Sequence, residues 1–62
     1  MKATIEIEMD NAAFEDGNAG AELARILRRV EKVVEDEDFK EGYRRPIMDI
    51  NGNKVGTFEV TE

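Results

Sequence analysis

The chain has 62 residues, of which fifteen are acidic and nine basic, and its formal net charge is −6. This length allows a single domain, residues 1–62. Cysteine, histidine and serine are all absent, which excludes disulfides, thiolate metal sites and the commonest catalytic acid/base and nucleophiles. We therefore expect no enzyme activity, no cofactor and no metal. The negative charge also argues against nucleic acid or an anionic membrane as the partner, because phosphate binding needs clustered Lys and Arg.

The first residues carry no secretory signal, since Met1 and Lys2 are followed by alternating glutamates rather than by an apolar stretch. No run approaches the ~20 apolar residues of a transmembrane helix. We expect a cytoplasmic protein.

Residues 3–9 alternate between apolar and polar side chains. The two sets are Ala3, Ile5, Ile7 and Met9 on one side and Lys2, Thr4, Glu6 and Glu8 on the other. This period predicts a half-buried strand with one face in solvent.

A connection with turn-forming residues follows over residues 10–20. A short helical turn at residues 12–14 ends at Gly17, and Phe14 is expected to cover the core rather than contact a ligand. Asn18 is a suitable N-cap for a helix that begins at Ala19.

Residues 19–36 form the predicted helix. Its apolar stripe, placed at 100° per residue, consists of Leu23, Ile26, Leu27, Val30, Val33 and Val34. An apolar stripe as broad as this one suits packing on a sheet. The helix should end near Asp36, because Glu37 would rotate back into the stripe.

After a polar return loop over residues 38–45, Pro46 indicates the start or the edge of a strand. Residues 47–60 read as a hairpin around Asn51–Gly52, for which two turns compete. One is a two-residue type I′ turn at Asn51–Gly52. The other, which we favour, starts a type I turn at Asp49 and closes it at Gly52.

The spacing of Val55 and Phe58 does not fit one face of a regular strand, which predicts a bulge at Gly56–Thr57. The complete pattern predicts an α+β fold, β-α-β-β, with one helix on a three-stranded antiparallel sheet of order 1-3-2. The first strand is then an edge, and dimerisation through it or through the uncovered sheet face is one hypothesis.

Residues 49–53 superficially resemble a calcium loop, but the glycine is fourth and position twelve is Val60, so we interpret them as a turn. A run of acids at the helix C-terminus is unusual, because the helix dipole is already negative there. Residues that violate local preferences are candidate functional positions. The candidate partner-binding set is Glu35, Asp36, Glu37, Asp38 and Glu41.

The alternative hypothesis is a nucleic-acid-associated accessory protein that uses basic side chains of the helix and the return loop. Its candidate contacts are Arg25, Arg28, Arg29, Arg44 and Arg45, with Tyr43 available to stack on a base.

Three stretches, NAAFED at 11–16, AELARIL at 21–27 and DINGNKVG at 49–56, together resemble a group of small bacteriophage- and prophage-encoded proteins. The resemblance implies a phage origin, hence the host cytoplasm, and transfers no catalytic or binding residue. We expect a non-enzymatic protein that binds a host or phage protein, with inhibition of nucleic-acid-handling or defence machinery by charge mimicry as its action.

Overall fold

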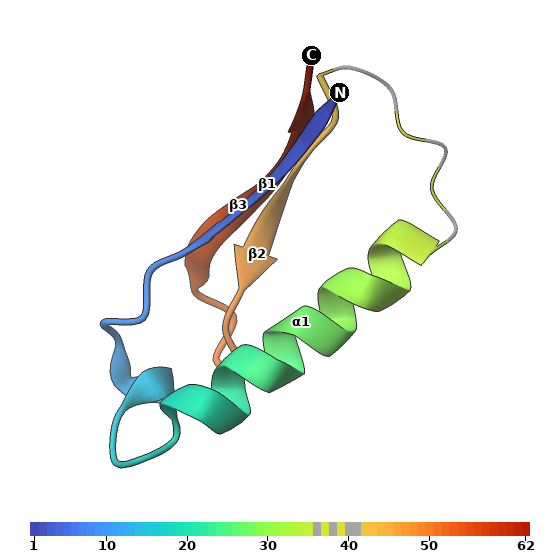
Figure 1. Cartoon of the computed structure of the whole chain (residues 1–62). Helices are drawn as coiled ribbons and strands as arrows, with labels where there is room; N and C mark the ends of the chain where they lie inside the picture. The colour runs from blue at the N-terminus through green and yellow to red at the C-terminus, as the bar shows by residue number, and fades with distance from the viewer. Residues whose placement is uncertain (36, 38, 40–41) are drawn as a thin grey trace.

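The computed structural model describes residues 1–35, 37, 39 and 42–62. Its elements are β1 (Lys2–Ile7), the 3-10 turn η1 (Ala12–Phe14), α1 (Ala19–Glu35), β2 (Arg44–Met48) and β3 (Lys54–Thr61). The helix lies on one side of a three-stranded sheet (Figure 1). The predicted α+β fold is therefore confirmed, and the helix begins and ends within one residue of its predicted bounds.

The sheet is antiparallel with the order β1-β3-β2, as the sequence predicts. The last strand is central: Lys2 of β1 pairs with Thr61, and Arg44 of β2 pairs with Glu59. Both β1 and β2 are consequently edge strands. Pro46 lies in β2, where a missing N–H is tolerated. The two chain termini lie side by side at one end of the sheet (Figure 1).

The predicted position of the bulge is wrong. Ile47 pairs with Gly56 and Met48 with Lys54, so Val55 is the additional residue on β3. Gly56 stays in the ladder, paired with Ile7 and Ile47, and a Cβ atom added there would overlap the carbonyl oxygen of Glu6. The bulge instead falls one residue earlier and brings Val55 into the core, where it is buried.

The favoured turn of the hairpin is confirmed. The Gly52 N–H donates to the Asp49 carbonyl at 3.1 Å, and the Asp49 N–H donates to the Asn53 carbonyl at 2.8 Å. Gly52 has a φ of +84°, which a glycine adopts without strain.

The short helical turn before the helix and the burial of Phe14 are confirmed. Residues 12–14 make one 3-10 turn, and Phe14 is buried in the core. Asn18 precedes the helix, and its carbonyl accepts the first helical hydrogen bond, from Glu22 N–H at 2.8 Å.

The core lies between α1, η1 and the β2–β3 side of the sheet. Its buried apolar residues are Phe14, Ile26, Ile47, Val55, Phe58 and Val60. Phe58 stacks with Phe39, their ring centroids 5.6 Å apart, and meets Tyr43 edge to face at 6.0 Å.

The sequence predicts a half-buried first strand and an apolar helical stripe packed on the sheet, and the structure leaves part of both exposed. Ile5 and Leu27 are each 44% exposed, and Met9 is 39% exposed. The reason is the position of the helix, whose backbone approaches η1 and β2 most closely, so that Ile5 is left largely exposed while Ile7 still packs against the core. Among the described residues, no helix is long and apolar enough to cross a membrane.

Candidate functional site

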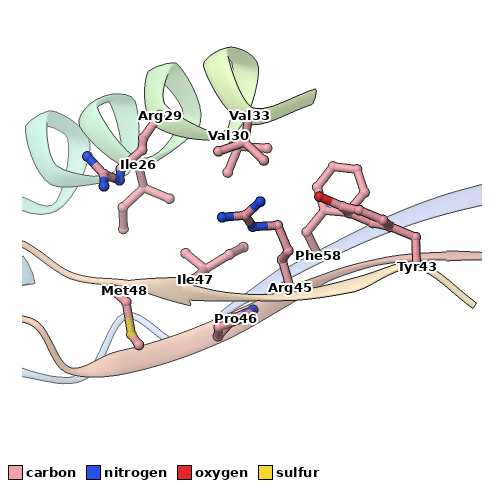
Figure 2. A pocket seen from close by; sticks show the side chains of 10 residues that line it. All are labelled: Ile26, Arg29, Val30, Val33, Tyr43, Arg45, Pro46, Ile47, Met48 and Phe58. Atoms are coloured by element: carbon pink, nitrogen blue, oxygen red, sulfur yellow. The ribbon is translucent and has the colours of Figure 1, made fainter. Parts of the chain in front are cut away.

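An open pocket of about 240 Å³ lies between α1 and β2. Ile26, Val30 and Val33 point into it from the helix, and Ile47 and Phe58 come from the sheet (Figure 2). These apolar walls exist because the stripe of α1 faces β2 while the side chains between them leave space unfilled. The pocket is somewhat smaller than the ~300–1,000 Å³ of typical small-molecule sites.

Three polar side chains line the same pocket. Arg45 extends from β2 toward the helix, Arg29 comes from α1, and Tyr43 lies at the end near Phe58 (Figure 2). Among the described residues, neither arginine forms an ion pair, and the buried hydroxyl of Tyr43 has no hydrogen-bond partner. The pocket therefore combines apolar walls with two positive charges in a chain of net charge −6.

A second polar group joins the helix to the hairpin. The Glu22 carboxylate, 5% exposed, accepts hydrogen bonds from Arg25 Nε at 2.6 Å and from Arg25 Nη2 at 3.2 Å. Its Oε2 also accepts from the Ile50 N–H at 2.8 Å, and Arg25 Nη2 donates to the Met48 carbonyl at 3.3 Å. A buried carboxylate needs such partners, and here every contact lies within α1 or joins α1 to the β2–β3 turn.

Asp49 organises the turn itself and is 4% exposed. Its Oδ1 accepts the N–H groups of Asn51 at 2.9 Å and Asn53 at 2.8 Å. Its Oδ2 accepts the side-chain amides of Asn11 at 2.6 Å and Asn53 at 3.3 Å. This carboxylate therefore closes the turn and also connects it to the segment that precedes η1, a structural role typical of aspartate in turns.

The two buried carboxylates both favour the charged form. The hydrogen bond from Arg25 lowers the pKa of Glu22, against the opposing effect of burial. Burial by itself would raise the pKa of Asp49, but the hydrogen bonds from Asn53, Asn11 and Asn51 outweigh it and lower that pKa. Glu22 in turn raises the pKa of Arg25 above its ordinary value. None of these groups is suited to neutral-pH proton transfer, because all stay charged.

The predicted acidic contact set is only partly described. Glu35 ends α1 and Glu37 follows it, and both are exposed. Asp36, Asp38 and Glu41 lie outside the described residues. Within the described part of the chain, no group of three or more acidic side chains is placed to hold a metal ion.

The predicted arginine set does not form one surface. Arg25 is engaged by Glu22, and Arg29 and Arg45 line the pocket. Arg44 and Arg45 are neighbours in β2, so their side chains point to opposite faces of the sheet. Arg28 is exposed on α1.

Sequence reasoning missed the roles of Glu22, Asn11 and the Asp49 carboxylate. Glu22 could have been noticed, because it precedes Ile26 by four residues and therefore shares the buried face of the helix. No signal in the sequence indicates that Asn11 contacts a residue 38 positions away.

No family model, curated protein or solved structure matches the chain. The site must therefore be interpreted from its own geometry.

Proposed function

We propose that the protein is a non-enzymatic protein-binding domain, and that the pocket between α1 and β2 receives an apolar side chain of its partner. The observation that carries the proposal is the open apolar pocket with two arginines at its walls. Its volume of about 240 Å³ suits a side chain of a polypeptide better than a whole small-molecule ligand. The absence of serine, cysteine and histidine supports binding rather than catalysis.

The charges in the pocket specify the partner further. Arg29 and Arg45 have no acidic partner among the described residues, so an incoming carboxylate would meet two guanidinium groups. Arginine binds carboxylates through paired N–H donors. The partner segment on this proposal carries one apolar anchor with an Asp or Glu close to it in sequence.

Selection from a random peptide library tests the proposal directly, because it requires no identified partner. We expect enriched peptides to share an apolar residue beside an acidic one, and to bind with micromolar affinity. Val30→Phe, which fills the pocket, and Arg45→Glu, which reverses a wall charge, should each weaken binding about tenfold or more.

The matched control is Arg28→Glu, which makes the same charge change at an exposed position of α1 that does not line the pocket. Equal loss of binding in Arg28→Glu and Arg45→Glu would show a non-specific charge effect and contradict the proposal. So would enriched peptides that bind Val30→Phe as well as the parent protein.

The action of such a domain as a phage-encoded inhibitor that mimics phosphate charge stays a prediction. Its support is the net charge of −6 and the exposure of Glu35 and Glu37 at the end of α1. Charge reversal at Glu35 and Glu37 tests it, with Glu31→Lys as a control on the same helix. If a partner identified by crosslinking from host lysate still binds the reversed variant, the acidic run is not its contact.

A further inference from the structure

The outer edge of β1 presents unpaired backbone groups. Glu8 N–H donates to the Val55 carbonyl at 2.8 Å, which continues the β1–β3 register and shows that even-numbered residues bond to β3. Val60 of β3 pairs with Ala3, but its N–H donates in the opposite direction, to the carbonyl of Tyr43 beside β2 at 2.9 Å. In an antiparallel ladder the groups alternate. The N–H and C=O groups of Ala3, Ile5 and Ile7 therefore point away from the sheet.

This edge lacks two of the features that block pairing with another strand, a proline and a bulge, although it carries the charged residues Lys2 and Glu6. Residues Lys2–Ile7 contain no proline and pair with β3 without a register shift. The other edge strand, β2, contains both Pro46 and the register shift at Ile47–Met48. An unprotected edge can pair with another chain.

We propose that β1 pairs antiparallel with β1 of a second copy of this chain, with Ile5 opposite Ile5. The backbone alternation allows only odd-numbered residues to exchange hydrogen bonds across this edge. Centring on Ile5 pairs Ala3 with Ile7 in both directions, so that all the outward-pointing backbone groups of the strand find partners. The sheet then runs continuously through both copies.

The side chains of β1 complement themselves in this register. Each Lys2 lies opposite Glu8 of the second copy, which directly follows β1 and continues its register, with Glu6 diagonal to it. Within its own sheet Lys2 lies directly opposite Thr61 and diagonal to Glu59, and among the described residues it forms no ion pair. On the other face Ile5, 44% exposed in the monomer, packs against its equivalent.

The neighbouring registers fit less well. Centring on Glu6 places two carboxylates directly opposite each other, which is destabilising. Centring on Thr4 pairs Lys2 with Glu6 but leaves the outward-pointing backbone groups of Ile7 opposite Met1, outside the strand, whereas centring on Ile5 pairs all such groups within β1. The proposed contact uses β1 and not the pocket at β2, so it goes beyond the proposed function, and either can fail without the other.

Sedimentation equilibrium at physiological ionic strength tests the proposal, with the pairing of Lys2 and Glu8 as the reporter. The parent chain should dimerise. Lys2→Glu and Glu8→Lys should each weaken dimerisation about tenfold, because both variants place like charges opposite each other twice. The double variant with both changes should dimerise like the parent, and an equimolar mixture of the two single variants should form a heterodimer. Circular dichroism of each variant verifies that it is folded.

A parent chain that stays monomeric at millimolar concentration overturns the proposal. Single variants that dimerise as well as the parent overturn it too. If the combination of Lys2→Glu with Glu6→Lys restores the dimer while the combination with Glu8→Lys does not, the Ile5-centred register is wrong.

Discussion

The carboxylate of Glu22 in α1 accepts a hydrogen bond from the backbone N–H of Ile50, 2.8 Å away in the turn between β2 and β3. The same carboxylate holds Arg25, which reaches the Met48 carbonyl. Helix and hairpin are therefore joined by polar contacts at one end and by Ile26 and its apolar neighbours along their length. In a chain of this size such contacts matter, because little apolar surface is available.

Glu22→Leu should lower the melting temperature more than Glu22→Gln. Leucine removes the partner of the Ile50 N–H and of Arg25, whereas glutamine keeps a carbonyl oxygen for one of them. The measurement is thermal unfolding by circular dichroism. Glu31→Gln, exposed on the same helix, is the control and should change the free energy of unfolding by less than about 0.5 kcal/mol. If Glu22→Leu has the same melting temperature as the control, the hydrogen bonds of Glu22 between the helix and the hairpin add no stability.

The lowered pKa values of Glu22 and Asp49 predict loss of stability in acid. A carboxyl whose pKa is lower in the folded state stabilises the fold at any pH above its ordinary value, which is 4.5 for Glu22 and 3.8 for Asp49. The contribution should decrease as the pH falls below these values and vanish below the folded-state pKa values.

Urea unfolding at pH 7, 5, 4 and 3 measures this dependence. The parent and a Glu22→Gln/Asp49→Asn variant should differ most at pH 7 and converge toward pH 3, because the variant carries no charge at these two positions. The comparison between the two proteins removes the effect of the other carboxylates. A constant difference at all pH values would contradict the assignment.

Gly56→Ala should destabilise the protein, whereas Gly20→Ala should stabilise it. A Cβ atom at Gly56 would overlap the backbone of Glu6 and Ile7, and these atoms cannot move away as a side chain would. Inserting a methyl group into a filled site costs about 1–3 kcal/mol, and we expect the upper end of that range.

Gly20 lies in the first turn of α1 with no atom within 4 Å of the added Cβ. Alanine is there the better helix former, by at most about 0.5–1 kcal/mol. Chemical denaturation compares the two variants directly. Equal effects of both substitutions would contradict the close approach of β3 to β1.

Ile26→Ala and Leu27→Ala should differ strongly although they are adjacent in the predicted stripe. Ile26 is 2% exposed and Leu27 is 44% exposed. Removing the first leaves a cavity and should cost about 2–5 kcal/mol. Truncating Leu27 should cost less than about 1 kcal/mol, because much of its surface is already in water. Similar losses for both would mean that α1 covers more of the sheet in solution than the structure shows.

The order of elements and the sheet topology were predictable because they depend on local patterns. The alternation of residues 3–9, the stripe of α1 and the pair Asp49 and Gly52 each specify a period or a turn that few neighbours influence. The helix could be placed on the sheet, but not over a particular pair of strands. For that reason the exposure of Ile5 and Leu27 was wrongly predicted.

The bulge and the buried polar contacts depend on residues that meet only in the folded chain. Val55 takes the bulge while Gly56 lies beside Glu6, in a contact between strands at opposite ends of the sequence. Asn11 and Asp49 meet in the same way. The pocket between α1 and β2 was equally unpredictable. It arises because the apolar side chains that line it do not fill the space between the helix and the strand, whereas their apolar character alone suggests that they do.

The pairing of Lys2 with Thr61 has a practical consequence for rearranging the chain. Because these positions are neighbours, a short glycine-rich linker can join Met1 to Glu62, and a new chain opening can be made at Gly17, which is exposed and has a φ of +81°. Such a circular permutant would keep every strand pairing while connecting β3 directly to β1. For the same reason, the unpermuted domain can be inserted into a surface loop of another protein, because both of its junctions lie at one end of the sheet.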